Sequence, residues 1–323
     1  MNSKQRKALI LGSEGQDGYF LRKLLLHENY SLCCTVKNSE RLTQFESSDD
    51  LKFEVLNISN TKDFIRIVQD FQPDEIYNLA GMSSVSNSFK FPDLCMESNY
   101  LAVKRILDFL RDTNSKSKFY QSSSSEIFGN LIARASENTD YNPVSPYGEA
   151  KSMAHQLCIQ YRLEFGLNVS TGILFNHESE RRSRNFVSRK ITSSVAAIKR
   201  GEISSFTLGN ILISRDWGYA PDYVRAMHLI LQAAAPADYV VATGVSRTLG
   251  DFIVTALRLA ELDGNIEDYV IMDNDLKRET DLITSVGDAT KIYDELGWVP
   301  KTKFEKMVEI MIATDLLNLD AEK

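Results

Sequence analysis

The chain has 323 residues and a net charge of −7, and 43% of its residues are hydrophobic. This length suits one large domain or two lobes with a substantial core. An acidic chain lacks the lysine and arginine surface that phosphate contacts require, which argues against a nucleic acid partner. No apolar run is long enough to span a membrane, and residues 1–7 lack the apolar core of a signal peptide. The four cysteines show no metal-ligand spacing, so we expect a cytoplasmic protein without a metal site.

Short apolar runs alternate with amphipathic stretches through the first half of the chain. The runs that predict strands are residues 8–12, 32–36, 53–58, 74–80, 118–124 and 169–175. The stretches that predict helices are residues 19–28, 61–71, 96–111 and 146–165. Strand–helix alternation with β-branched apolar runs indicates an α/β fold built on a doubly wound parallel sheet.

The alternation changes after residue 176, where the strands become shorter and the loops longer. Helices are predicted at residues 186–200, 222–233, 249–262, 288–296 and 304–317. We therefore assign residues 1–176 to a first domain and residues 177–323 mainly to a smaller C-terminal lobe. The apolar run at 239–244 can return to the main sheet, so part of the segment at about 205–245 is assigned to the first domain as well.

A glycine-rich turn connects the first predicted strand to the first predicted helix. The segment GSEGQDG places Gly12, Gly15 and Gly18 in a GxxGxxG pattern. Residues without Cβ permit a tight turn and allow a pyrophosphate to approach backbone N–H groups at a helix N-terminus. Its place at the start of a βαβ unit predicts a Rossmann-type dinucleotide-binding domain over residues 1–176. The alternative is an ordinary glycine-rich loop.

The residues after the second predicted strand indicate which dinucleotide is bound. Sites selective for NAD usually have an acid here that holds the ribose hydroxyls. This chain has Lys37 in that place, with Arg41 nearby, so a 2′-phosphate would meet cations. We expect NADP, while NAD remains an alternative because Lys37 can also be a solvated turn residue and Glu40 opposes the cations.

A tyrosine and a lysine lie four residues apart in the segment SPYGEAK. Tyr147 and Lys151 fall on one face of a predicted helix. The positive charge of the lysine is expected to stabilise phenolate and lower the pKa of Tyr147. A phenolate can accept a proton from a sugar hydroxyl while a nicotinamide accepts hydride from the same carbon.

Four serines and a glutamate follow the fifth predicted strand. Ser124 can hydrogen-bond the hydroxyl that is oxidised, and Glu126 lies on the same face if the segment stays extended. Once the sugar carries a ketone, a carboxylate can remove the adjacent proton and then protonate a leaving hydroxyl. The segment therefore has the groups for elimination of water. The alternative is that the serines only close a strand and Glu126 is a solvated turn residue.

These motifs resemble the extended short-chain dehydrogenase/reductase superfamily, and most of all the GDP-mannose 4,6-dehydratase family. The resemblance covers nearly the whole chain and rests on the segments GQDG, EIYNLA, KFYQSSSSEIFG, SPYGEAK, GILFNHESERR, NFVSRKI and RDWGYAPDYVRAM. It implies that Ser124, Glu126 and Tyr147 are catalytic, with serine where the family usually has threonine. It also implies that Lys151 holds the cofactor ribose.

The resemblance also implies a set of cofactor contacts. Together with the glycine turn, these are Gly12, Gly15, Gln16, Asp17, Gly18, Lys37, Asn57, Ile58, Leu79, Ser83, Lys151, His177 and Arg182. The chain departs from the family pattern at four places. Lys37 and Asn38 replace paired arginines, Asn57 replaces an aspartate, Met82 replaces a polar residue, and the region 262–278 is shortened.

Polar and cationic residues of the second half are candidates for binding the nucleotide sugar. The run 181–190 is rich in arginine, and such runs are usually solvated faces. It follows the C-terminal end of the sixth strand, however, where α/β folds bind ligands. Arginine can meet phosphate bidentately, and by resemblance Arg215 and Arg278 hold the nucleotide diphosphate. The expected substrate-binding residues are Asn176, Asn185, Lys190, Arg215, Arg278 and Asp281.

The resemblance implies a lyase that converts a GDP-linked manno-configured sugar to its 4-keto-6-deoxy product. Two enzymatic alternatives are a GDP-manno-heptose 4,6-dehydratase and a GDP-4-keto-6-deoxy-sugar reductase. Glu126 argues against the reductase, which needs no acid or base for elimination. A non-enzymatic dinucleotide sensor is disfavoured because the tyrosine–lysine pair is present. The family resemblance further implies a homo-oligomer, either a dimer or a tetramer.

Overall fold

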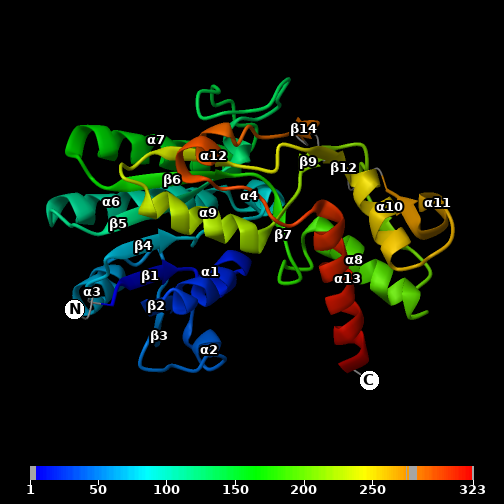
Figure 1. Cartoon of the computed structure of the whole chain (residues 1–323), viewed down its shortest axis with the longest axis horizontal. Helices are drawn as coiled ribbons and strands as arrows, with labels where there is room; N and C mark the ends of the chain where they lie inside the picture. The colour runs from blue at the N-terminus through cyan, green and yellow to red at the C-terminus, as the bar shows by residue number, and fades with distance from the viewer. Residues whose placement is uncertain (1–4, 274, 276–281, 322–323) are drawn as a thin grey trace.

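The computed structural model describes residues 5–273, 275 and 282–321. Within these ranges the main sheet has seven parallel strands in the order β11-β6-β5-β4-β1-β2-β3 (Figure 1). The strands are β1 (Lys7–Leu11), β2 (Ser31–Val36), β3 (Leu51–Val55), β4 (Glu75–Asn78), β5 (Lys118–Ser124), β6 (Val169–Leu174) and β11 (Asp238–Val241). The prediction of a doubly wound parallel sheet is confirmed.

Helices cover both faces of this sheet, as the continuous apolar strands require. One face packs against α1 (Gln16–His27), α9 (Ala220–Gln232) and α12 (Thr290–Leu296). The other face packs against α3 (Thr61–Phe71), α6 (Ala102–Asp112) and α7 (Pro146–Phe165). Each layer has its own buried cluster, so the two faces of the sheet contribute separately to the core.

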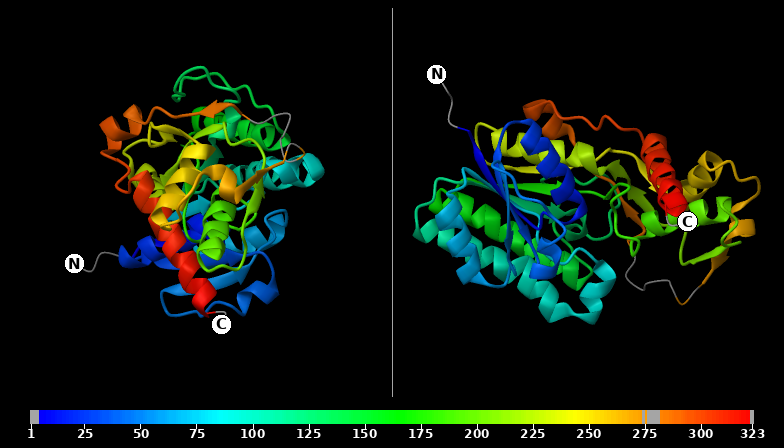
Figure 2. Two further views of the ribbon diagram at one scale, coloured as in Figure 1. Left: turned by 90° about the vertical axis from the view of Figure 1, so that its right-hand side faces the viewer. Right: turned by 90° about the horizontal axis from the view of Figure 1, so that it is seen from below.

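A smaller lobe lies beside the carboxyl edge of the sheet (Figures 1 and 2). Its core forms between α8 (Val187–Lys199), α10 (Leu249–Leu259) and α13 (Phe304–Ala321). The remaining strands are β7 (His177–Glu178), β8 (Phe206–Leu208), β9 (Ser214–Asp216), β10 (Gly218–Tyr219), β12 (Ser246–Thr248), β13 (Val270–Met272) and β14 (Thr284–Ser285). The short helices are α2 (Ser39–Leu42), α4 (Val85–Lys90), α5 (Pro92–Met96) and α11 (Ile266–Tyr269). The domain boundary at residue 176 stays a prediction.

Several predicted boundaries differ from those of the structure. The first helix begins at Gln16 rather than at residue 19, directly after the glycine turn. The single helix predicted at 96–111 is instead α5, a π-helical turn η1 (Glu97–Leu101) and α6. β4 ends at Asn78, so residues 79–84 form a loop rather than the end of a strand. The periodicity of apolar residues does not predict these boundaries, because tertiary contacts determine where each helix or strand ends.

The strand order reverses between β1 and β4, since β1 continues to β2 on one side while β4 continues to β5 on the other. In open α/β sheets, ligands bind in the crevice at the carboxyl ends of the strands beside such a reversal. Within the described ranges, no helix is long and apolar enough to cross a membrane.

Candidate active site

The glycine turn after β1 is held by close backbone packing. Gly12 has a φ of +80°, and a Cβ at this position would lie 2.9 Å from the backbone of Ala80. A Cβ on Gly18 would lie 2.5 Å from the Cα of Ser13. Gly15 is different, because its Cβ would meet only the Gly12 carbonyl oxygen at 3.5 Å, which leaves space before the first turn of α1. This geometry fits the pyrophosphate of a dinucleotide, which needs both the tight turn and an open approach.

A cleft of about 420 Å³ runs from this turn across the ends of β2, β3 and β4. It contains most of the predicted cofactor-binding residues: Gly12, Gly15, Gln16, Asp17, Gly18, Lys37, Asn57, Ile58, Leu79, Ser83 and Arg182. Lys37 and Asn57 are exposed at its edge. Arg41 lies in α2, with its Nε 3.9 Å from Glu14 Oε2, so the cations near Lys37 are partly offset by an acid.

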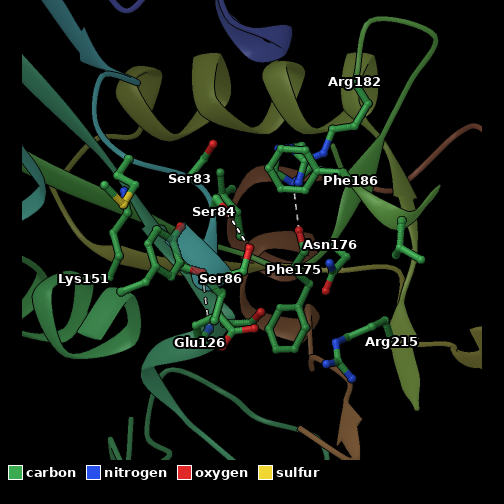
Figure 3. A pocket seen from close by; sticks show the side chains of 18 of the residues that line it. Ser83, Ser84, Ser86, Glu126, Lys151, Phe175, Asn176, Arg182, Phe186 and Arg215 are labelled. Carbon is green, nitrogen blue, oxygen red and sulfur yellow. Dashed lines mark hydrogen bonds between the residues drawn. The ribbon is translucent and has the colours of Figure 1, made fainter. Parts of the chain in front are cut away.

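A second pocket of about 300 Å³ continues from the first. Asp17, Arg182 and the loop 79–83 line both, so the two form one extended cleft. The second pocket brings together Ser124, Glu126, Tyr147, Lys151, Asn176, His177, Asn185 and Arg215 (Figure 3). These residues come from β5, η2 (Ser125–Ile127), α7, β7, β9 and their connecting loops.

The helix α7 places Tyr147 and Lys151 at the wall of this pocket. Pro146 is its first residue, and the Ser145 side chain accepts a hydrogen bond from Gly148 N–H at 3.0 Å. The Lys151 Nζ donates to the Ser122 carbonyl oxygen at 2.9 Å and lies 5.8 Å from the centroid of the Tyr147 ring. The helix spacing thus brings the ammonium against the ring, as the sequence predicted.

The expected lowering of the tyrosine pKa is wrong for the chain alone. Burial raises the pKa of Tyr147 to about 12, although a hydrogen bond with Ser124 opposes the shift. Burial also lowers the pKa of Lys151 to about 8, so this ammonium loses its proton readily. The physical reason is that desolvation disfavours the charged form of each group and is the largest effect on the pKa of either one.

Glu126 reaches the pocket by a different route from the one predicted. The chain does not stay extended after β5 but enters the 3₁₀ turn η2. Ser124 is the N-cap of this turn, and its hydroxyl oxygen accepts from Glu126 N–H at 3.3 Å. Both side chains nevertheless line the same pocket as Tyr147. Because the turn hydrogen-bonds Ser124 to the Glu126 backbone, the two are held in a fixed relation.

Polar contacts join the glycine turn to the loop after β6. His177 Nε2 lies 2.9 Å from Asp17 Oδ2, and His177 Nδ1 lies 2.8 Å from the Phe175 carbonyl oxygen. Gln16 Nε2 donates to the His177 carbonyl oxygen at 3.1 Å. Burial lowers the pKa of His177, but the Asp17 carboxylate outweighs it, so the net pKa lies above the ordinary value. An imidazolium with two acceptors fits these contacts, since it donates from both nitrogens.

The predicted cofactor residue Arg182 and the other predicted substrate residues have varied surroundings. Arg182 lies 3.1 Å from Glu178 and stacks 3.6 Å from the centroid of the Phe186 ring. Arg215 donates to the Leu282 carbonyl oxygen at 2.7 Å while it lines the pocket. Lys190 lies on α8 and is not among the residues that line either pocket. Arg278 and Asp281 lie outside the described residues.

The structure adds pocket residues that the sequence reasoning did not name. Ser84 is the N-cap of α4 and Ser86 lies in its first turn, and their hydroxyls are 3.0 Å apart. Asn210 and Trp217 line the same pocket as Arg215. The run of hydroxyls in SSVS was a signal for the first two, whereas nothing in the sequence placed the last two beside the pocket. Among the described residues, no group of three or more His, Cys, Asp or Glu side chains could hold a metal ion.

Comparison with known proteins identifies the relatives of this chain. The model of the family described as GDP-mannose 4,6 dehydratase matches residues 9–311. The chain belongs to this family. It is 39% identical to GDP-mannose 4,6 dehydratase 1 of Arabidopsis thaliana over 336 residues, covering 99% of this chain and 92% of that protein. It is 33% identical to the human GDP-mannose 4,6 dehydratase over 345 residues, covering 98% and 93% of the two chains.

Solved structures of other nucleotide-sugar enzymes share the fold. A UDP-glucose 4-epimerase from Thermotoga maritima with UDP-glucose has a TM-score of 0.86 at 21% identity, covering 97% of this chain and 99% of the other. A dTDP-glucose 4,6-dehydratase from Bacillus anthracis in complex with NAD has a TM-score of 0.83 at 19% identity, covering 98% of each chain. At sequence identities this low, the similarity to these structures shows that the present chain has the same fold. It says nothing about which ligands the chain binds.

Proposed function

We propose that this member of the family is an NADP-dependent GDP-mannose 4,6-dehydratase. The observation that carries the proposal is the convergence of Ser124, Glu126 and Tyr147 on one pocket that continues into the dinucleotide cleft. A hydroxyl, a carboxyl and a phenol are the groups that oxidation followed by elimination requires. Relatives named for this activity cover nearly the whole chain, which supports the assignment.

The cleft fits a nicotinamide dinucleotide. The pyrophosphate would lie against the open backbone at Gly15, and the ribose would be held by Lys151. The 2′-phosphate of NADP would be bound by Lys37 and Arg41. No acid follows β2 directly, which favours NADP over NAD, although Glu14 near Arg41 weakens that preference. When bound, the cofactor would supply a positive charge and reversible hydride chemistry beside the sugar.

The side chains of the pocket would handle the protons of the sugar. Tyr147 takes the proton of the 4-hydroxyl, and Ser124 hydrogen-bonds the same oxygen. Glu126 removes the proton of carbon 5 and gives it to the 6-hydroxyl, which leaves as water. Carbon 4 becomes a ketone, and carbon 6 receives the hydride that carbon 4 lost and becomes a methyl group. Carbon 5 regains a proton from Tyr147, which returns the one it took from the 4-hydroxyl, so one water is lost and no cofactor is consumed. Tyr147 is a phenol in the chain alone, so it needs added positive charge in the cleft before it can act as a base.

The nucleotide end of the substrate would lie toward the smaller lobe. Arg215 and Asn176 line this part of the pocket, and Asn185 lies at its exposed rim. Arginine suits a diphosphate because its planar fork donates two parallel hydrogen bonds. Arg215 donates a hydrogen bond to the Leu282 carbonyl oxygen, and this bond fixes the orientation of its guanidinium group.

A product assay tests the proposal. The purified protein is incubated with GDP-mannose and a catalytic amount of NADP, and the nucleotide sugar is analysed by mass spectrometry. We expect a product lighter by one water, without net change in cofactor absorbance. A reductase would leave GDP-mannose untouched, and a sensor would bind only the cofactor. A parallel reaction with a GDP-manno-heptose decides between the two dehydratase assignments, and faster turnover of the heptose would overturn the choice of mannose.

A further inference from the structure

Two buried amide side chains form a hydrogen-bonded chain behind the active-site pocket. Asn78 and Gln121 are each 1% exposed, and they are direct cross-strand partners on β4 and β5. Asn78 Nδ2 donates to Gln121 Oε1 at 2.8 Å. Gln121 Nε2 donates to the Ser122 carbonyl oxygen at 3.0 Å, the same oxygen that accepts from Lys151 Nζ at 2.9 Å.

The chain has one possible direction. At one end, Ala80 N–H donates to Asn78 Oδ1 at 3.3 Å, and a backbone N–H can only donate. At the other end, the Ser122 carbonyl can only accept. The orientation of both amides therefore follows from groups of fixed polarity rather than from a choice between oxygen and nitrogen. Hydrogen bonds aligned in one direction also strengthen one another.

The two ends of this chain lie at functionally different places. Ala80 belongs to the loop 79–83, which lines both the dinucleotide cleft and the adjoining pocket. Ser122 provides the acceptor that holds the Lys151 ammonium on the other side. Neither Asn78 nor Gln121 lines either of these two pockets, so neither is placed to touch a ligand bound there.

We propose that Asn78 and Gln121 are positioning residues, which hold the Ser122 carbonyl and the loop after β4 so that the Lys151 ammonium points into the cleft. The inference rests on the proposed function, because it assigns Lys151 a role in the reaction. Buried polar side chains in a sheet core are costly unless they are fully paired, and pairing between neighbouring strands gives these two a defined geometry. A pair of apolar residues at this register would leave the Ala80 N–H and the Ser122 carbonyl without these partners.

The other groups that act on Lys151 come from three helices. Its ionisable neighbours are Cys95 on α5, Cys158 on α7 and Asp17 on α1, and the Tyr147 ring lies one helical turn earlier on α7. Both thiols are buried and uncharged at neutral pH, since burial raises the pKa of each. A substitution of Asn78 or Gln121 leaves all four of these groups in place. Its effect on the pKa of Lys151 can therefore be measured separately from theirs.

The test measures the titration of Lys151 directly. Protein labelled with [ε-¹³C]lysine is titrated by NMR without substrate, and the Lys151 resonance is assigned by its loss in Lys151→Met. Gln121→Glu keeps the shape of the side chain, but its carboxylate cannot donate to the Ser122 carbonyl, so the variant removes that hydrogen bond and places a negative charge near Lys151. Because this negative charge favours the ammonium, we expect the pKa of Lys151 to rise by about one unit or more. The neutral variant Gln121→Met should show no such rise.

Turnover provides the second readout. We expect Gln121→Met to lower kcat about tenfold, because a misplaced catalytic group slows turnover. KM should stay nearly unchanged. Gln232→Met is the matched control. Gln232 lies at the opposite end of the sheet, where it donates to Glu75 at 3.0 Å, so its loss should affect stability without affecting kcat. If the Glu variant does not fold, Asn78→Ser replaces it, and a lowered kcat is again expected.

The outcomes separate this inference from the proposed function. An unchanged Lys151 pKa in Gln121→Glu, or wild-type kcat in a folded Gln121→Met or Asn78→Ser variant, overturns the positioning role. A shifted titration in a protein that never dehydrates GDP-mannose supports the positioning of Lys151 while it refutes the proposed reaction.

Discussion

The serines at the end of β5 have three different roles in the structure. Ser122 contributes its carbonyl oxygen, which accepts from both Lys151 and Gln121. Ser123 is buried, and its hydroxyl has no hydrogen-bond partner among the described groups, although it lines the pocket. Ser124 caps the following turn and hydrogen-bonds Tyr147. The run of identical residues is therefore a series of distinct contacts set by strand alternation and by the turn.

In the proposed mechanism, elimination of water depends on Glu126. The Glu126→Gln substitution keeps the size of the side chain but leaves an amide, which can neither take the carbon 5 proton nor give a proton to the leaving hydroxyl. We expect water loss to fall by about 10²–10⁴-fold, the usual contribution of a general acid–base group. Cofactor affinity, measured by fluorescence titration, should stay at the wild-type value. Unchanged water loss in this variant would remove Glu126 from the mechanism.

The pH dependence of the reaction follows from the buried lysine. Burial lowers the pKa of Lys151 to about 8, so its positive charge is present below that pH and lost above it. We expect kcat/KM, which reports the free enzyme, to fall as the pH rises through about 8. Lys151→Arg keeps its charge at these pH values, so the alkaline fall should disappear even if its rate is lower. A profile for the wild-type protein that stays flat up to about pH 10 would contradict the assignment.

At the scale of elements, α7 carries both Tyr147 and Lys151, and its start is well defined. Ser145 accepts from Gly148 N–H at 3.0 Å, Pro146 follows, and Gly166 ends the helix with a φ of 63°. Proline suits the first helical position because its missing N–H has no partner there in any case. The cap thus fixes where the helix begins and, through the helical repeat of about 3.6 residues, which face the two site residues share.

Loss of this cap is a test of how α7 is held. Ser145→Ala leaves one buried N–H of the first turn without its acceptor and should lower the free energy of unfolding by about 1 kcal/mol. Urea denaturation measures the change. Ser204, an exposed residue of the loop between α8 and β8, offers a matched control, since Ser204→Ala removes a serine hydroxyl outside any helix turn. Equal stability of the Ser145 variant and the wild type would show that α7 is positioned by packing alone.

At the scale of the whole molecule, a buried ion pair holds the smaller lobe together. Arg189 on α8 and Asp315 on α13 are in contact, and their side chains are 6% and 2% exposed. Both helices pack around the apolar core of the lobe. Because α8 follows directly from the loop that carries Arg182 and Asn185, this pair also restrains one wall of the pocket.

Removal of one partner should be costly. Arg189→Met leaves the Asp315 carboxylate buried without its cation, and we expect a loss of about 3–5 kcal/mol in the free energy of unfolding. Lys306→Met is the control, because Lys306 and Glu309 form an exposed pair at 2.9 Å that should contribute less than about 1 kcal/mol. Denaturation curves of the two variants are compared with the wild type. A loss in Arg189→Met no larger than in the control would show that the pair is not important for the lobe.

The expected homo-oligomer is also a property of the whole molecule, and it stays a prediction. Light scattering of the purified protein distinguishes a dimer or tetramer from a monomer. Large apolar side chains are exposed on α4 and α5 and beside them, with Phe89, Phe91 and Leu94 between 46% and 55% accessible. Exposed apolar side chains that gather in this way are typical of a protein–protein interface.

The amino-acid pattern by itself determined the order of elements and the main chemical groups of the site. The parallel sheet, the glycine turn, and the spacing of Tyr147 and Lys151 are local patterns, because strand alternation and helical repeat depend on near neighbours. The loop after β4 and the π-helical turn were not predicted, since contacts with distant segments set where those elements end.

Only the tertiary structure decided the protonation of the site and the partners behind it. Burial raises the pKa of Tyr147 and lowers the pKa of Lys151, which reverses the expectation from charge proximity alone. The pairing of Asn78 with Gln121 depends on the register of two strands that are 43 residues apart at this point. Desolvation and strand register are properties of the packed molecule, so no local stretch of sequence contains them.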